Sequence, residues 1–340
     1  MARQGAFRRR VQHGLQGSRR RLHMSLAKSK TPTRRALAER MLEAGSERDD
    51  FVVFESDIGY STYSYLFGDA YPERYFNLGI AELGTMATAA GMAAEGRPAI
   101  VCGYGVFLSM RALEAVRSFI CYPRMNVKIF SSHGGVTAAV DGVTHQATED
   151  IAFMATLPGM TVLAPCDSAS ARASFDLALG IHGPVFVRLM RDPLSELYPE
   201  GTEFSIGGCH TPRKGDDITI VSYGDLVFQA LEAAELLATE GINAEVIDMY
   251  SIKPWDRQAL RLSLERTKAL LVVENHQRKN GLGYELAAWC MREGVSVPFA
   301  QLGLDDTFAE SGSYPLTIQK FGMDAASIAA AARKLAAAKY

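Results

Sequence analysis

The strongest constraint on the fold of this chain is a regular alternation of short apolar runs with longer helical stretches. In the first half, five runs rich in β-branched and aromatic residues are short and continuously apolar, at 51–55, 97–102, 126–131, 161–164 and 184–189. This pattern is typical of strands in a parallel sheet that is covered on both faces. The segments between them have helical character, at 33–45, 80–95, 108–121 and 168–179. Asp167 is the expected N-cap of the last of these helices.

The alternation breaks at a stretch rich in Gly, Pro and charge and then restarts. The second half predicts strands at 217–222, 243–249, 269–275 and 297–302. It predicts helices at 226–239, 256–266, 283–292 and 324–338. We therefore predict an α/β protein with two doubly wound domains, each with a mostly parallel sheet flanked by helices. The expected boundaries are a first domain at 31–200, a linker at 201–214 and a second domain at 215–340.

Charge separates the N-terminal segment from the rest of the chain. Residues 1–35 contain nine Arg and two Lys but no acidic residue, and without residues 1–23 the formal net charge falls from −2 to −9. The folded part is therefore acidic, which argues against a nucleic-acid surface on it. The basic segment is compatible with a transit peptide, with sequence upstream of a start at Met24, or with a nucleic-acid-binding arm. We expect residues 1–30 to be a disordered extension without a catalytic role.

Cysteine spacing and hydropathy narrow the class of protein. The five cysteines are scattered and form no C-x-x-C pair, so neither a disulfide framework nor a zinc site is indicated. No apolar run approaches the roughly 18–20 residues of a membrane span. We expect a cytoplasmic protein without a membrane partner. The chain also lacks G-x-G-x-x-G, G-x-x-x-x-G-K-[ST], H-E-x-x-H and G-x-S-x-G, which disfavours a Rossmann dehydrogenase, a P-loop NTPase, a zincin or a serine hydrolase.

Polar residues are concentrated in the first half. Glu82 begins an otherwise apolar helix, where it is either a surface residue favoured by the helix dipole or a carboxylate in an apolar cleft that can carry a proton. The segment 131–150 follows a strand and brings His133, Asp141 and His145 together with several glycines. Ligand sites in open α/β sheets lie at such strand ends, so we expect a binding site here. A metal site is disfavoured, because the two histidines have no third ligand nearby.

Two arginines close the last strand of the first half. Arg188 and Arg191 lie in FVRLMRDP, and either could be surface charge or a ligand for phosphate or carboxylate.

Three segments of the chain resemble the C-terminal half of the thiamine-diphosphate-dependent transketolase family. RYFNLGIAE, at 74–82, resembles the family segment that ends in the catalytic Glu, and DGVTHQ, at 141–146, resembles its D-G-x-T-H-Q signature. PVFVRLMR, at 184–191, resembles the strand that ends in a substrate-phosphate Arg. The resemblance covers about residues 32–338. It implies a thiamine-diphosphate pyrimidine-binding domain followed by a transketolase C-terminal domain.

The resemblance also implies roles for individual residues. Glu82 would hydrogen-bond the pyrimidine ring of the cofactor and carry a proton there, and Phe107 would pack on that ring, with Asp57 also in the cofactor site. His145 would lie near the donor carbonyl and act with Glu82 as a catalytic residue. The remaining residues would bind the sugar phosphate: His133, Asp141, Arg191, Arg34 and Ser61. Met110 and Leu113 stand where the family has further aromatics.

The sequence departs from the family in one major respect, because it lacks the G-D-G module that binds diphosphate and Mg²⁺. The resemblance therefore implies one subunit of a split transketolase. Mg²⁺ would be held by an N-terminal diphosphate-binding partner subunit, in an α₂β₂ assembly acting on phosphorylated sugars. Three alternatives remain open: the beta subunit of a 2-oxo acid dehydrogenase, a deoxyxylulose-phosphate-synthase-like enzyme, and a non-catalytic interaction protein.

Overall fold

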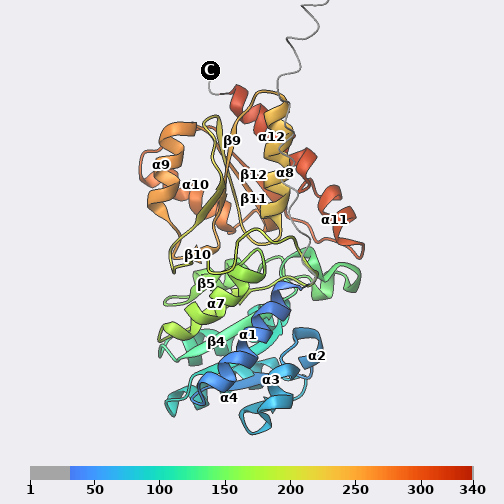
Figure 1. The fold of residues 1–340 in the computed structure, drawn as a ribbon, viewed down its shortest axis with the longest axis vertical. Helices are drawn as coiled ribbons and strands as arrows, with labels where there is room; N and C mark the ends of the chain where they lie inside the picture. The colour runs from blue at the N-terminus through green and yellow to red at the C-terminus, as the bar shows by residue number, and fades with distance from the viewer. Residues whose placement is uncertain (1–30, 339–340) are drawn as a thin grey trace, which may run out of the picture.

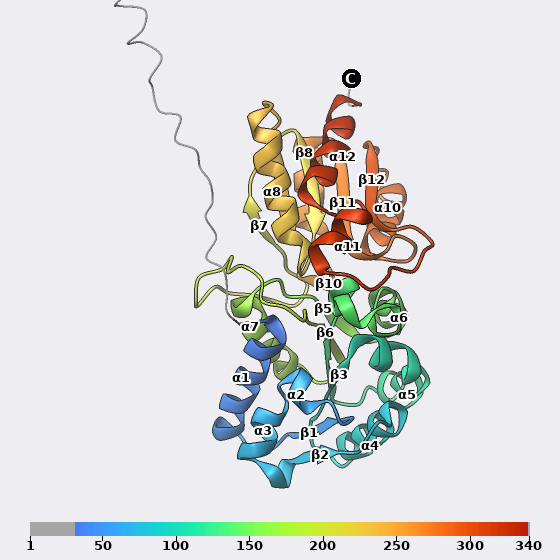
Figure 2. The same ribbon diagram turned by 90° about the vertical axis from the view of Figure 1, so that its right-hand side faces the viewer.

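A computed structural model describes residues 31–338 as two α/β units stacked end to end (Figure 1). The extension expected at 1–30 lies outside the described residues. The predicted fold class is confirmed, because the described part contains a seven-stranded and a five-stranded sheet, both mostly parallel and flanked by helices (Figure 2). None of the described helices is long and apolar enough to cross a membrane.

The larger sheet has the strand order β10-β5-β6-β4-β3-β1-β2. Five of its strands coincide with the predicted runs: β1 (Val52–Glu55), β3 (Ala99–Tyr104), β4 (Val127–Ser132), β5 (Thr161–Leu163) and β6 (Val185–Arg188). The edge strand β2 (Tyr75–Asn77) was not predicted, since it is only three residues long. All pairings are parallel except that of β10 (Ser251–Lys253) with β5.

Helices cover both faces of this sheet (Figure 2). One face packs against Leu37, Phe67 and Phe175, which come from α1 (Thr33–Glu47), α3 (Tyr65–Ala70) and α7 (Ser168–Gly180). The other face packs against α4 (Glu82–Ala94), the continuous segment η2 (Phe107–Arg111), α5 (Leu113–Ala115) and η3 (Val116–Cys121), and α6 (Asp150–Thr156). Short elements complete this unit: α2 (Gly59–Thr62), η1 (Pro72–Arg74), η4 (Val136–Asp141) and η5 (Val143–His145).

Helix α7 begins as the sequence predicts. The Asp167 carboxylate accepts a hydrogen bond from the Ser170 backbone amide at 2.9 Å, and the Ser170 hydroxyl accepts one from the Asp167 amide at 3.0 Å. This reciprocal capping box satisfies two backbone donors that have no partner inside the helix.

The smaller sheet has the order β12-β11-β8-β9-β7. Its strands are β7 (His210–Arg213), β8 (Ile218–Ser222), β9 (Ala244–Asp248), β11 (Leu270–Gln277) and β12 (Phe299–Leu304). One face is covered by α8 (Leu226–Thr239) and α12 (Ala325–Ala337), the other by α9 (Arg257–Thr267) and α10 (Leu282–Arg292). Strand β7 lies within the segment expected as a linker and pairs antiparallel with β9, and α11 (Tyr314–Lys320) packs near η4. The expected linker is therefore partly ordered into the second sheet.

The two units share structure at their junction. Strand β10 follows β9 of the smaller sheet in the chain but pairs with β5 in the larger sheet. The Lys253 ammonium on β10 donates hydrogen bonds to the carbonyls of Ala155 and Leu157 at 2.7 and 2.6 Å, at the end of α6. One apolar cluster also runs from the first unit into the second, where it includes Leu282 of α10. These contacts join the two units.

Candidate active site

The polar residues singled out in the sequence gather at one edge of the larger sheet. The loops that follow β1, β3, β4 and β6 leave their strands at the same, carboxyl-terminal edge, because these strands are parallel. This edge is where ligands bind in open α/β sheets. The predicted residues Arg34, Ser61, Glu82, Phe107, His133, His145 and Arg191 are linked there by the contacts described below.

Glu82 is a buried carboxylate at the start of α4. Its side chain is only 4% exposed and accepts a hydrogen bond from Arg111 Nη1 at 2.8 Å, whereas the Arg111 side chain is 52% exposed. A carboxylate in the first turn of a helix also interacts favourably with the helix dipole. Glu82 is therefore buried beside an arginine and does not lie on the open surface.

Arg111 connects Glu82 to the aromatic part of the site. Its guanidinium lies over the Phe107 ring, with 4.7 Å between the guanidinium carbon and the ring centroid. Both residues come from η2, a π-helical turn in which the Ala112 amide donates to the Phe107 carbonyl. Such turns are rare and concentrate at functional sites. The Phe107 ring also contacts His145, whose ring lies edge-on to it with centroids 5.4 Å apart.

A second cluster contains two arginines and His133. Arg34 donates its Nε to the Arg191 carbonyl at 2.9 Å and its Nη1 to the Ser61 hydroxyl at 3.1 Å. The Ser61 hydroxyl is in turn 2.7 Å from the Tyr104 hydroxyl. The Tyr104 ring packs on His133, with centroids 4.1 Å apart. Tyr104 therefore lies between the cationic cluster and the Phe107–His145 pair.

His133 is held as a neutral imidazole. It is almost completely buried, has φ of +62°, and its Nδ1 is 2.9 Å from the Ser132 hydroxyl. Burial, with added repulsion from the charges of Arg34 and Arg191, lowers the pKa of His133 to about 3. Burial also lowers the pKa of Arg34 below its ordinary value. The cluster thus combines two guanidinium groups with a neutral histidine, a set suited to a bound anion.

The remaining predicted residues are more exposed. Asp141 ends η4 and Asp57 follows β1, and both carboxylates face solvent. Asp57 has φ of +59° and accepts a hydrogen bond from the Asn77 amide group at 3.0 Å, so it shapes the loop that precedes α4. Among residues 31–338, no group of three or more His, Cys, Asp or Glu side chains is placed to hold a metal ion.

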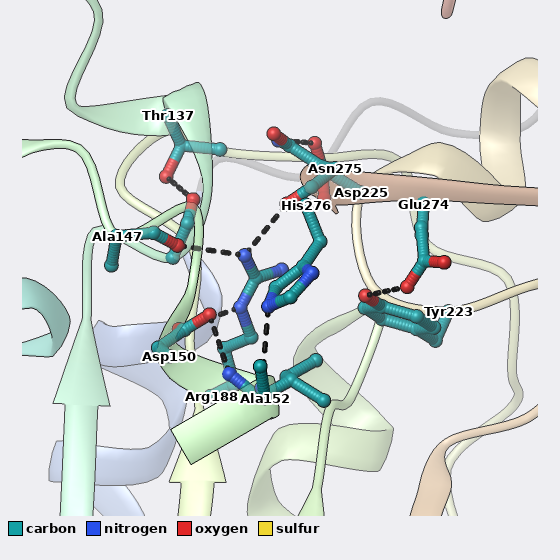
Figure 3. A network of polar contacts seen from close by, with 12 residues as sticks. Thr137, Ala147, Asp150, Ala152, Arg188, Tyr223, Asp225, Glu274, Asn275 and His276 are labelled. Carbon is teal, nitrogen blue, oxygen red and sulfur yellow. Dashed lines mark hydrogen bonds and ion pairs between the residues drawn. The ribbon is translucent and has the colours of Figure 1, made fainter. Parts of the chain in front are cut away.

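The sequence left two interpretations of Arg188 open, surface charge or a ligand for a bound anion, and its environment in the structure fits neither. Its side chain is fully buried, and its Nε donates to Asp150, itself fully buried, at 2.8 Å (Figure 3). It is therefore neither surface charge nor an exposed anion ligand. The sequence could not predict this ion pair, because Asp150 lies 38 residues away on α6.

Comparisons with known proteins identify both units. Residues 29–195 match the family model for the transketolase pyrimidine-binding domain, and residues 207–328 match that for the transketolase C-terminal domain. An apulose-4-phosphate transketolase subunit of Phocaeicola vulgatus is 33% identical over 300 residues, which cover 88% of this chain and 96% of the relative. The chain belongs to the transketolase family. The predicted resemblance to the C-terminal part of this family is confirmed.

Other members of the family are similar to this chain over most of its length. The 6-deoxy-6-sulfo-D-fructose transketolase subunit SqwH of a Clostridium species is 37% identical over 295 residues, covering 87% of this chain and 91% of the relative. A solved structure described as a split gene transketolase in an inactive beta4 tetramer is 38% identical and superposes with a TM-score of 0.84, covering 92% of this chain and 100% of that one. Human transketolase is 30% identical over 90% of this chain, which corresponds to 49% of the human protein.

Two residues of this candidate site were missed by sequence reasoning. Arg111 was not singled out because a helix surface arginine carries no local signal, and its partner Glu82 lies 29 residues earlier. Tyr104 was missed because the end of β3 resembles an ordinary strand terminus. A usable signal was present: Tyr104, the last residue of β3, lies between Gly103 and Gly105, and Phe107 begins the next turn.

Proposed function

We propose that this chain is the pyrimidine-binding subunit of a two-subunit, thiamine-diphosphate-dependent transketolase that moves a two-carbon ketol unit between phosphorylated sugars. The observation that carries the proposal is the buried Glu82 carboxylate, linked through Arg111 and Phe107 to His145 and, beyond Tyr104, to the cationic cluster of Arg34, His133 and Arg191. In this proposal, one edge of the sheet would provide both a proton-carrying group and an anion site within a single chain of contacts.

The residues present fit the ring end of the cofactor. A nearly buried carboxylate with one half-exposed cationic partner can hydrogen-bond a heterocyclic nitrogen, and the half-buried Phe107 ring beside it supplies an apolar packing surface. Glu82 and Phe107 would hold the pyrimidine ring, with Asp57 and Asn77 shaping the loop that precedes α4. When bound, thiamine diphosphate supplies the thiazolium carbon that accepts the two-carbon fragment. Glu82 would hold a proton at the ring nitrogen.

The anion site would orient the sugar. Arg34 and Arg191 supply charge, while His133 and Ser61 supply neutral hydrogen-bonding groups, so a phosphate bound there would be fixed in direction as well as held. His145, whose ring packs edge-on against Phe107, would contact the carbonyl of the sugar, and Asp141 would contact one of its hydroxyls. Relatives that are named for apulose-4-phosphate and for 6-deoxy-6-sulfo-D-fructose both take an anionic sugar, which agrees with an anion site of this kind.

The other half of the cofactor site would come from a partner. The sequence has no G-D-G module, so we expect a separate diphosphate-binding subunit to hold Mg²⁺ and the diphosphate. Relatives of this chain are named as transketolase subunits, and a solved relative is described as an inactive beta4 tetramer. We therefore expect self-association of this chain, which becomes active as an α₂β₂ assembly with the partner.

Co-expression with a diphosphate-binding subunit tests the proposal. The purified complex, supplied with thiamine diphosphate and Mg²⁺, should convert xylulose 5-phosphate and ribose 5-phosphate, or another ketose phosphate and aldose phosphate, by two-carbon transfer. Either subunit alone should be inactive. Turnover of pyruvate with glyceraldehyde 3-phosphate would favour the deoxyxylulose-phosphate-synthase-like alternative, and transfer to a lipoyl domain would favour the 2-oxo acid dehydrogenase. A complex without any of these reactions would contradict an enzymatic role.

A further inference from the structure

The loop that carries three of the predicted site residues is attached to the second unit. Residues 133–148 include His133, Asp141 and His145, and we call them the substrate loop. Its two ends are tied together, because the amide of Gly135 donates to the Ala147 carbonyl at 2.8 Å and the reverse bond is 3.0 Å. A shift at either end of this loop is therefore transmitted to the other.

Asn275, on β11 of the second unit, contacts this loop directly. Its side-chain oxygen accepts a hydrogen bond from the Val136 amide at 2.8 Å. Its side-chain amide donates to Asp225 at 2.7 Å (Figure 3). Asn275 is fully buried. The second bond fixes the orientation of the side chain, so that its oxygen and not its nitrogen faces the loop. A lost partner would leave the Val136 amide buried without an acceptor.

The fit between Asn275 and the loop is close. A Cβ atom on Gly135 would lie 2.2 Å from the Asn275 side-chain oxygen, and Gly135 has φ of +58°. Arg188 completes the contact, since its Nη2 donates to the carbonyls of Ala147 and Asn275 at 3.2 and 2.8 Å. The loop backbone is thus held from both ends by one buried network that includes β11.

We propose that Asn275 is a positioning residue that holds the substrate loop, and with it His133, in the shape that binds the anionic end of the sugar. The second unit contributes none of the predicted site residues, and this contact gives it a role in substrate binding. The proposal rests on the proposed function for its effect on catalysis. The attachment of the loop rests on the contacts alone.

The kinetic test uses Asn275→Ala in the complex with the partner subunit. Displacement of the anion site should weaken the affinity for the donor more than it slows the chemical step. KM for the phosphorylated donor should therefore rise about tenfold while kcat stays within about twofold. KM for the same ketose without its phosphate should change little. An unchanged KM for the phosphorylated donor would overturn the proposal.

A neighbouring residue provides the matched control. Glu274 is also fully buried, but successive strand residues face opposite sides, and its carboxylate accepts bonds from the Leu282 and Gly283 amides of α10 at 2.9 and 3.0 Å. Glu274→Gln should lower the thermal stability of the chain but leave KM unchanged. An equal rise in KM for both variants would show that general destabilisation causes the effect, which would also overturn the proposal.

A reciprocal exchange tests the hydrogen bond itself. The double variant Asn275→Asp with Asp225→Asn keeps an acceptor for the Val136 amide and restores a donor–acceptor pair between the two side chains. Its KM should return to within about threefold of the original value. A double variant with the KM of Asn275→Ala would contradict a role for this acceptor.

Hydrogen exchange on the full chain supplies a readout without activity. Peptides that cover 131–148 should exchange faster in Asn275→Ala, and at the original rate in Glu274→Gln. If Asn275→Ala does not fold, Gly135→Ala disturbs the same contact from the loop side and should give the same pattern. Unchanged exchange in the loop would refute the attachment. An unmodified complex that turned over no sugar would refute the proposed function alone.

Discussion

At the level of single residues, Glu82 is a buried carboxylate paired with the half-exposed Arg111. An isosteric substitution can therefore remove its charge without changing the size of the side chain. Glu82→Gln keeps the size of the side chain and removes the ability to hold the proton. Since a positioned acid or base contributes about 10²–10⁴-fold to a rate, kcat of the assembled enzyme should fall at least about 100-fold. The assembly itself should persist, which size-exclusion chromatography with light scattering can check alongside the kinetics.

Glu95 offers a control on the same helix, because it is the exposed C-cap residue of α4. Glu95→Gln should retain full activity. A Glu82→Gln enzyme with more than half of the original kcat would remove Glu82 from the catalytic machinery.

His133 allows a test through stability and pH. The imidazole is neutral in the folded chain, where its pKa is about 3, and takes up a proton in the unfolded chain below its ordinary pKa of 6.5. Between these values the unfolded state binds more protons, so acid destabilises the fold. The free energy of unfolding should therefore fall between pH 7 and 4.5 by about 2 kcal/mol more in the original chain than in His133→Gln. Urea denaturation at both pH values measures this difference.

The exposed His182 serves as the comparison for this experiment. His182→Gln should keep the pH dependence of the original chain. Parallel pH dependence for His133→Gln and the original chain would show that His133 is not held neutral by the fold.

At the level of elements, the sequence predicted what local patterns determine. The five predicted strands of the first half became β1, β3, β4, β5 and β6, and the predicted helices of the second half lie within about two residues of α8, α9, α10 and α12. Strand β10 could not be predicted, because its three residues pair with β5, about 90 residues earlier. The π-helical form of η2 was also missed, since the period of its apolar residues is still that of an ordinary helix.

The site was predictable to a different extent. His133 and His145 lie in a polar, glycine-rich segment, and Glu82 is an isolated charge in an apolar helix, so all three can be noticed along the chain. Arg111 and Tyr104 act through contacts with residues about 30 positions away, which leave no mark on the local sequence. Burial likewise decided the environment of Arg188, which depends on α6 and β11 together.

A prediction about elements concerns the lysine that attaches strand β10 to helix α6. Lys253 donates to the last carbonyls of α6, and burial lowers the pKa of its ammonium below the ordinary value. Lys253→Met would leave these carbonyls without their donor, so the free energy of unfolding should fall by about 1–3 kcal/mol in urea titrations. The exposed Lys334 on α12 is the control, since Lys334→Met should change stability by less than about 0.5 kcal/mol. Equal stability of Lys253→Met and Lys334→Met would show that β10 does not depend on this anchor.

At the level of the whole molecule, the two units are joined by contacts next to the candidate site. The first unit supplies the predicted catalytic and binding residues, and the second supplies β10 to the first sheet and Asn275 to the substrate loop. A truncated first unit would therefore lose an edge strand and the loop attachment together. The predicted site residues all come from the first unit, but the second unit supplies an edge strand to its sheet and a contact that holds the substrate loop.

The proposed division of the cofactor site between two chains gives the last prediction. In the proposed site, Glu82 and Phe107 would contact the pyrimidine, and the sequence carries no diphosphate-binding module. The lone chain should therefore distinguish poorly between thiamine and thiamine diphosphate. In calorimetric titrations with Mg²⁺, both should bind more weakly than about 100 μM, because contacts to one ring leave little surplus after the cost of association. Addition of the diphosphate-binding partner should tighten thiamine diphosphate at least about tenfold and leave thiamine almost unchanged. If the lone chain bound thiamine diphosphate in the low micromolar range and thiamine far more weakly, it would hold the diphosphate itself, and the two-chain site would be wrong.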